Sequence, residues 1–177
     1  MRERTQKLLE LLKSSGPSLY ALLTRLTLRE DVAEDLMQEL FVRLNSSRAF
    51  KNAENPPAYA HKAAANLALD WRRKQAREPV PLAYMREPGS NDNSPLSNLA
   101  QKEQLEETLN AISQLGELYR QTLVMRYIQQ DSYEEIAQAL GRDKHHVRVL
   151  CSRAIGQLRD LLASDKAQSP RKGVSNG

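Results

Sequence analysis

The sequence predicts an all-α fold, in which two small helical domains are joined by a flexible linker. Leu, Ala, Glu, Gln and Arg, which favour helices, dominate the chain. No stretch alternates apolar and polar residues in the manner of a half-buried strand. The 177 residues include only two Phe, one Trp and seven Gly, which also argues against a sheet.

The first domain, residues 1–77, is predicted to open with two short helices. Ser14-Ser15-Gly16 is a breaker sequence that ends the first helix. Pro17 suits the first turn of a second helix, where a backbone amide has no partner within the helix. This second helix is expected to reach about Leu28.

Two longer helices complete the first domain. One begins near Asp31, which has capping-box spacing to Glu34, and its apolar stripe is Val32, Ala33, Leu36, Met37, Leu40, Phe41 and Leu44. After a polar loop over 45–55, Pro56-Pro57 opens a helix that runs to about Arg77. The residues that this helix is expected to bury are Ala60, Ala64, Leu67 and Trp71.

Residues 78–100 are predicted to form the linker. Residues 78–98 contain four of the eight prolines in the chain, and proline fixes φ and removes a backbone donor. The two domains are therefore expected to pack independently. The second domain is predicted over 101–163, and the polar residues 164–177 are predicted to form a disordered tail.

The second domain is predicted to begin with two helices, over 101–112 and 117–128. The residues expected to point into its core are Leu105, Leu109, Ile112, Leu118, Val124 and Tyr127. A third and a fourth helix follow and end near Ala163.

These last two helices form a helix-turn-helix pattern, which is the most informative motif of the chain. Ser132 to Leu140 has helical spacing and Gly141 marks a tight turn. Asp143 suits the cap of the second helix, because its carboxylate can accept an amide proton of the first turn. The apolar face of the second helix comprises Val147, Leu150, Cys151, Ala154 and Leu158. Such units place their second helix in a DNA major groove.

The opposite face of the second helix carries guanidinium, imidazole, hydroxyl and small apolar groups. Its residues are His145, Arg148, Val149, Ser152, Arg153 and Gly156. These residue types can contact phosphates, guanine edges and thymine methyl groups. An ordinary amphipathic helix with a solvated basic face is the alternative interpretation.

A second stripe with nucleic-acid chemistry lies on the helix that ends near Arg77. At spacings near three and four it carries Tyr59, Lys62, Asn66, Asp70, Arg73 and Arg77. An aromatic ring, an amide and several cations in a row can stack on a base, bond its edge and neutralise phosphates. A structural helix with a solvated face would show the same residues.

The charges are unevenly distributed along the chain. The net charge of +4 is mild, but residues 30–39 hold five acids and no base, whereas residues 72–77 hold four bases and no acid. One acidic and one basic surface indicate two different partners. Solvated helix faces are again the alternative.

Several classes of protein are excluded by what the sequence lacks. The single cysteine, Cys151, excludes an internal disulfide and falls on an apolar face. No apolar run approaches the roughly 20 residues that span a bilayer, and no signal-peptide core follows the N-terminus, so a cytoplasmic protein without membrane insertion is expected. Three His and one Cys show no zinc spacing, and no phosphate-binding Gly loop or catalytic grouping is evident. No enzyme activity, metal or cofactor is expected.

Three segments together resemble a known family. Residues 31–44 resemble region 2 of the extracytoplasmic-function (ECF) sigma factors of bacterial RNA polymerase, and residues 57–59 and 64–73 resemble the end of that region. Residues 133–137, with Val147-Arg148 and Arg153-Ala154, resemble region 4. The resemblance spans about residues 19–162 in the family's order, with a linker in place of region 3.

The resemblance implies a transcription initiation factor that binds core RNA polymerase, directs it to promoters and helps to open the −10 region. It implies that the β′ clamp helices of the polymerase contact Asp35, Gln38 and Glu39. It implies that the −10 element is read by the loop 45–57 and by Tyr59, Lys62, Asn66, Arg73 and Arg77. Region 4 would contact the β flap and place on the −35 element Lys144, His145, Arg148, Val149, Ser152 and Arg153.

Two alternatives remain beside the resemblance: a polymerase-independent helix-turn-helix regulator and an adaptor that binds no DNA. A repressor usually reads two half-sites as a dimer, whereas this chain offers two unlike DNA surfaces. The family often has Gly-Thr where this chain has His145-His146, which leaves the −35 sequence open. The promoters, the inducing signal and an anti-sigma factor are not fixed by the sequence either.

Overall fold

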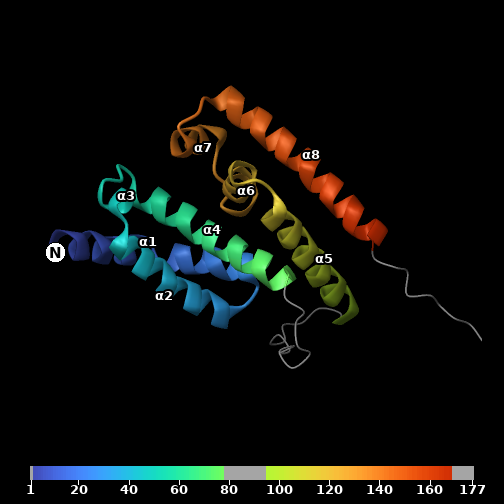
Figure 1. The fold of residues 1–177 in the computed structure, drawn as a ribbon, viewed down its shortest axis with the longest axis horizontal. Coiled ribbons are helices and arrows are strands. Elements are labelled where there is room, and N and C mark those ends of the chain that lie inside the picture. Colours follow the sequence, from blue (N-terminus) through green and yellow to red (C-terminus); the bar gives the residue numbers. More distant parts are fainter. Residues whose placement is uncertain (1, 78–94, 169–177) are drawn as a thin grey trace, which may run out of the picture.

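The structure confirms the all-α prediction. The computed structural model describes residues 2–77 and 95–168, and these residues form helices and turns without a strand. Figure 1 shows their arrangement. The elements are α1 (Arg2–Thr27), α2 (Glu30–Ser46), α3 (Arg48–Lys51), α4 (Pro56–Arg77), α5 (Pro95–Gln114), α6 (Glu117–Leu123), the π-helical η2 (Val124–Ile128), α7 (Tyr133–Leu140) and α8 (Lys144–Gln168).

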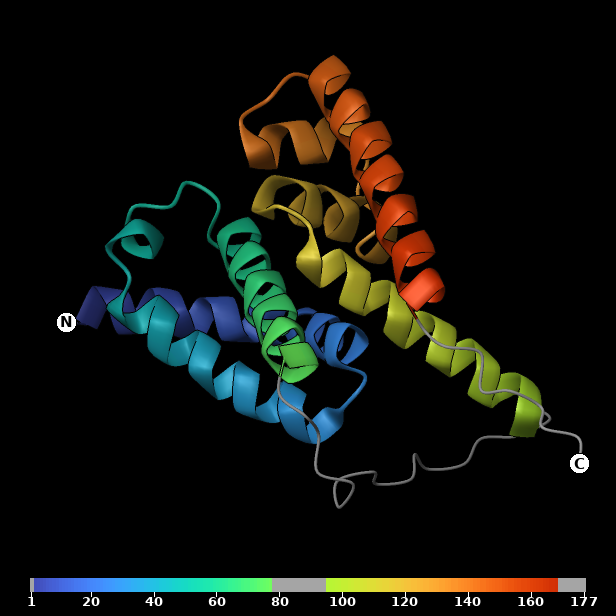
Figure 2. The same ribbon diagram turned by 45° about the vertical axis from the view of Figure 1, so that its right-hand side comes forward.

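Helices α1, α2 and α4 pack against one another and form, with α3, the N-terminal block (Figure 2). The apolar positions at spacings of three and four in each helix meet in a shared core. Side chains that are almost fully buried there include Leu19, Leu23, Leu26, Leu40, Leu44, Phe50 and Leu69. As predicted, Ala60, Ala64 and Leu67 are buried on α4, while Trp71 is only half-buried.

The predicted break in the first helix is wrong, because α1 continues through Ser14-Ser15-Gly16 and contains Pro17 in its interior. The buried positions Leu11, Ser15 and Leu19 keep a spacing of four across this segment. One side of the helix therefore stays in the core on both sides of the proline. Tertiary burial outweighs the local preference for a break.

The predicted capping box at Asp31 is also wrong. Helix α2 begins at Glu30, its cap position is Arg29, and no side chain caps it. The Asp31 carboxylate instead pairs with Arg29, whose Nη2 lies 2.5 Å from Oδ2. The hydrogen bond from Arg29 lowers the pKa of Asp31.

Helices α5 to α8 form the C-terminal block, in which α8 packs along α5 and α6. Leu109, Ile112 and Val124 are buried as predicted, but Leu105 and Tyr127 are 46% and 54% exposed. Tyr127 lies in the π-helical η2, where residues five apart share a hydrogen bond. The wider turn rotates Tyr127 out of the face that an α-helical period predicts.

The two blocks pack against each other, so the prediction of independent packing is wrong for the described residues. Helix α4 contacts α5 and α6, and the main apolar core includes residues of both blocks. Arg72, which is 4% exposed, joins them. Its guanidinium donates to the carbonyl oxygens of Leu26 and Thr27 at the end of α1, and its Nη1 donates to Oδ1 of Asn110 on α5 at 2.9 Å.

Arg72 acts as a buried cap for α1. A guanidinium suits this place because carbonyl groups without helical partners gather at a helix C-terminus. Burial lowers the pKa of Arg72, and the charge of Glu106 opposes this effect. The sequence pattern had placed Arg72 in a basic surface run, and this role depends on a contact that the pattern does not contain.

Two helices extend beyond their predicted limits. Helix α5 starts at Pro95 rather than near Gln101, and α8 continues to Gln168 rather than ending near Ala163. The remaining linker and tail residues, 78–94 and 169–177, lie outside the described residues.

Candidate nucleic-acid interface

Local hydrogen bonds cap the helices of the helix-turn-helix. Ser132 and Glu135 form a reciprocal capping box at the start of α7, with distances of 3.2 Å from the Glu135 amide to Ser132 Oγ and 2.7 Å from the Ser132 amide to Glu135 Oε2. Gly141 ends α7 with φ of 60°, a left-handed conformation that favours glycine. These signals set where α7 begins and ends.

Asp143 caps the recognition helix α8, as the sequence predicts. Its Oδ1 accepts the His146 amide proton at 2.8 Å, and this bond lowers the pKa of the Asp143 carboxyl. Lys144 pairs with Glu134 on α7, and this bond is the main cause of the lowered pKa of Glu134. The first turn of α8 is therefore tied to α7 by a charged contact as well as by the turn.

The two faces of α8 divide as predicted. Val147, Leu150, Cys151 and Ala154 are buried, and burial raises the pKa of the Cys151 thiol. We use the name recognition face for the opposite side, of which every member is exposed except the half-buried Val149. Its residues are Lys144, His145, Arg148, Val149, Ser152 and Arg153.

The predicted stripe on α4 differs from the recognition face, because several of its side chains form contacts within the protein. We call it the α4 stripe, and its residues are Tyr59, Lys62, Asn66, Arg73 and Arg77. Lys62 and Arg77 are exposed. The Tyr59 hydroxyl lies 3.1 Å from Ser47 Oγ, and its ring centroid lies 6.0 Å from that of Phe50. Tyr59 is thus anchored on the segment around α3.

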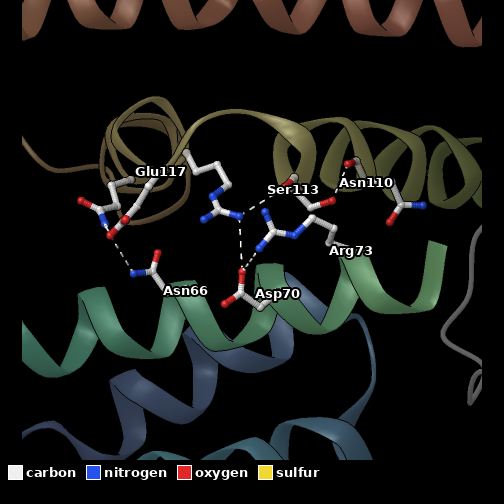
Figure 3. A network of polar contacts seen from close by, with 8 residues as sticks. Asn66, Asp70, Arg73, Asn110, Ser113 and Glu117 are labelled. Atoms are coloured by element: carbon white, nitrogen blue, oxygen red, sulfur yellow. Dashed lines mark hydrogen bonds and ion pairs between the residues drawn. The ribbon is translucent and has the colours of Figure 1, made fainter. Parts of the chain in front are cut away.

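The centre of the α4 stripe faces the C-terminal block. Asn66 Nδ2 donates to Glu117 Oε1 at 3.4 Å, and Arg73 Nη2 lies 2.5 Å from Asp70 Oδ1. The same Asp70 oxygen lies 3.4 Å from Nη1 of Arg120 on α6. Figure 3 shows Asn66, Asp70 and Arg73 directed from α4 towards Glu117 and Ser113.

Sequence reasoning missed the inter-block residues Glu117 and Arg120. Arg120 is 6% exposed, and its Nη1 also donates to the Ser113 carbonyl oxygen at 3.3 Å. Within the described residues, Arg120 Nε and Asn66 Oδ1 are buried without a hydrogen-bond partner. Both atoms lie where α4 and α6 meet.

A groove separates the two blocks beside these contacts. Its volume is about 910 Å³. Tyr59, Lys62 and Asn66 line one side, and residues of α6, η2 and α7 line the other. Part of the α4 stripe therefore lines this groove.

The predicted polymerase-binding residues lie together on α2. Asp35, Gln38 and Glu39 are exposed and share a face with Val42, which is 70% exposed. Glu39 pairs with Arg43 at 2.5 Å. We call Asp35, Gln38, Glu39 and Val42 the α2 face.

Other kinds of site receive no support from the described residues. No group of three or more His, Cys, Asp and Glu side chains there could hold a metal ion. Within the same ranges, no helix has both the length and the apolar character to cross a membrane.

Comparisons with known proteins agree with this geometry. The chain matches Sigma-70 region 2 over residues 11–78 and Sigma-70 region 4 over residues 105–158. The first match covers most of the N-terminal block, and the second covers α6 to α7 and much of α5 and α8. The two regions therefore coincide with the two blocks.

Two ECF RNA polymerase sigma factors are similar to the chain. The chain is 33% identical over 167 residues to the ECF RNA polymerase sigma factor SigE of Mycolicibacterium smegmatis. This match covers 90% of the present chain and 64% of the length of SigE. It is 27% identical over 147 residues to SigX of Bacillus subtilis, covering 80% of this chain and 76% of that protein.

A solved structure is also similar. The sigma factor RpoE, in complex with the anti-sigma factor NepR from Bartonella quintana, is 23% identical to this chain, with a TM-score of 0.46 over 93% of this chain and 99% of that one. The two matched regions and the two similar ECF sigma factors decide the classification. The chain belongs to the extracytoplasmic-function group of the sigma-70 family of RNA polymerase sigma factors.

Proposed function

We propose that the chain is an alternative sigma factor, which binds core RNA polymerase, directs it to specific promoters and helps to open the −10 region. The observation that carries the proposal is the presence of regions 2 and 4, in order, on two helical blocks. The exposed recognition face of α8 supports the same role, because a second helix with an exposed polar face can enter a major groove.

The function as a whole is tested with a promoter shift assay, performed with and without core polymerase. A sigma factor should bind its promoter specifically only together with core enzyme. Specific duplex binding by the chain alone would favour a polymerase-independent regulator. An absence of DNA binding in both conditions would favour an adaptor.

We assign polymerase docking to the α2 face. Its acidic groups and its exposed Val42 combine charge with apolar area, as protein interfaces do. The Asp35→Lys, Glu39→Lys double variant should weaken core-enzyme binding by about tenfold or more. Thermal unfolding should change little, because exposed substitutions usually alter stability by no more than about 0.5 kcal/mol.

A matched control uses Glu103 and Glu107 on α5, which are also exposed and four residues apart. The Glu103→Lys, Glu107→Lys double variant introduces the same change of charge on the other block. Core binding should survive in this control. Equal losses in the two double variants would indicate a general charge effect and would remove the α2 face from the docking surface.

We assign −35 recognition to the recognition face, with Arg148 as a base reader and Arg153 as a phosphate contact. Arg148 is nearer the N-terminus of α8, the end that usually enters the groove. Arg148→Ala should weaken holoenzyme binding by about 1–3 kcal/mol and relax selectivity at one −35 position. Arg153→Ala should weaken binding to all −35 variants by the same factor. It should also reduce the slope of the logarithm of the binding constant against the logarithm of the salt concentration by about one.

Arg159 provides the control for both substitutions. It is exposed on α8, and eleven helical residues after Arg148 place it on nearly the same face, about 16 Å farther along the helix. Arg159→Ala should leave −35 selectivity unchanged. Wild-type behaviour of Arg148→Ala on every −35 variant and salt concentration would exclude Arg148 from the DNA interface.

We assign −10 recognition to the α4 stripe and infer that the two blocks separate before it is used. The contacts of Asn66 with Glu117 and of Asp70 with Arg120 support this inference, because they occupy the side of α4 that DNA would need. Cysteines at positions 66 and 117, in a Cys151→Ser background, should be bridged by a short, reducible bifunctional thiol reagent, and the bridge should abolish holoenzyme function until it is reduced. A cross-linked chain that initiates as well as the reduced one would contradict the separation.

A further inference from the structure

The guanidinium of Arg148 lies against an aromatic ring of the preceding helix. Its Cζ is 5.4 Å from the ring centroid of Tyr133, within the range of an attractive cation–π contact. We propose that Tyr133 is a positioning residue for DNA recognition, whose ring holds Arg148 in the orientation from which it reads a base. This inference rests on the proposed role of Arg148 at the −35 element.

Tyr133 is itself held in place and can serve as a rigid support. It is the first residue of α7, directly after the capping-box residue Ser132. Its half-buried side chain packs against the core of the helix-turn-helix, which contains Ile136 and Val147. The position of the ring relative to α8 is therefore set by the same core that sets the position of the recognition helix.

A second arginine, Arg126, also contacts the Tyr133 ring. The Cζ of Arg126, in η2, lies 4.6 Å from the ring centroid of Tyr133, and its Nη1 donates to the Asp131 carbonyl oxygen at 2.9 Å. These contacts bridge the turn between η2 and α7, in which Gln130 has a φ of 63°. Arg126 thereby ties the turn and the ring together, while Arg148 remains exposed.

The Tyr133 ring is the aromatic contact of the Arg148 guanidinium among the described residues. The nearby carboxylate of Glu134 is paired with Lys144, and the ion pairs among the described residues do not include Arg148. An exposed arginine with free rotation loses side-chain entropy when it binds. A guanidinium that already rests on a ring loses less, so its discrimination between bases should be stronger.

The test measures holoenzyme binding to a series of single-base −35 variants. Tyr133→Leu keeps an apolar side chain but removes the ring, and should reduce the discrimination that depends on Arg148 by about two- to fivefold. Tyr133→Phe keeps the ring and should restore discrimination close to that of the wild type. Thermal unfolding of each variant, followed by circular dichroism, reports any loss of folding separately.

Tyr127→Leu is the matched control. Tyr127 is 54% exposed on the same block, and the change of side chain is the same. Holoenzyme with Tyr127→Leu should discriminate between the −35 variants as well as the wild type does. An equal loss in Tyr127→Leu and Tyr133→Leu, or a loss in Tyr133→Phe as large as in Tyr133→Leu, would overturn the positioning role.

A double-mutant cycle separates this inference from the proposed function. In an Arg148→Ala background, Tyr133→Leu should cause no further loss of discrimination, because the two residues act through one contact. If Arg148→Ala relaxes selectivity but Tyr133→Leu does not, the positioning role is wrong and the proposed function stands. If Arg148→Ala changes nothing, the assignment of Arg148 fails and the positioning role fails with it.

Discussion

The N-terminal block and the helix-turn-helix hold their shapes in different ways. Helices α1, α2 and α4 share a large core of nearly inaccessible leucines together with Phe50. The separate core cluster of the helix-turn-helix consists of Ile136, Ala137, Val147 and Cys151. Apolar burial therefore determines the first geometry, whereas the second depends strongly on caps, one left-handed glycine and one ion pair.

This difference suits the two proposed tasks. The α2 face is exposed, whereas the centre of the α4 stripe faces the C-terminal block. Both lie on helices whose opposite sides are fixed in a common core. The recognition face lies on the N-terminal half of α8, which packs on α7 through a small apolar core and a few polar contacts, while later residues of α8 join the main core. Local hydrogen bonds can orient a short helix accurately while they bury little area.

The largest effect on this comparison should come from the leucine core. Leu23 is fully buried, and Leu23→Ala should lower the free energy of unfolding by about 2–5 kcal/mol through lost burial and a residual cavity. Val147→Ala in the smaller core removes fewer atoms and should cost less. Urea unfolding followed by circular dichroism compares the two. A larger loss in Val147→Ala would reverse the contrast between the cores.

The second effect concerns the buried cation between the blocks. Arg72→Met leaves the carbonyl groups of Leu26 and Thr27 and Oδ1 of Asn110 without their donor. The free energy of unfolding should fall by about 1–3 kcal/mol. The neighbouring Arg73→Met removes a partly exposed ion pair, and should cost no more than about 1 kcal/mol. Urea unfolding measures both free energies. An equal decrease in Arg72→Met and Arg73→Met would mean that the buried contacts of Arg72 add no more stability than a partly exposed ion pair.

The smallest effect should come from the capping box. Ser132→Ala should lower the stability of the helix-turn-helix by about 1 kcal/mol, and the reactivity of the buried Cys151 with a thiol reagent measures this loss locally. The labelling rate should rise by about fivefold if labelling requires local opening. Ser46→Ala, at the exposed end of α2, is the control. An unchanged rate in Ser132→Ala would show that the cap contributes little.

The sequence predicted most helices because their apolar residues repeat at the helical spacing. The ends of α7 and the start of α8 were also predictable, because Ser132, Gly141 and Asp143 act on residues within a few positions of themselves. The two faces of α8 follow from the same periodicity. Their division into buried and exposed residues is confirmed, while the DNA-binding roles of the exposed residues stay predictions.

Some of the errors have a different physical origin, namely contacts between residues far apart in the chain. Pro17 lies inside a helix because core leucines continue on both sides of it. Arg72 is buried because α1 ends with its carbonyl groups directed at α4. The contacts of Arg72 cannot be detected in a window of neighbouring residues. Tyr127 is a different case, because it is exposed where a π-helical turn changes the local period.

Asp70 has one partner on its own helix and one across the contact between the two blocks. Its Oδ1 lies 2.5 Å from Arg73 on its own helix and 3.4 Å from Arg120 on α6. If α6 moves away, Asp70 keeps its nearer partner, so α4 exposes no bare charge. Arg120 would lose this ion pair, and Asn66 and Glu117 would lose their hydrogen bond, so these groups must be rehydrated. A substitution at position 120 can therefore change how readily the blocks part while the charge of α4 stays the same.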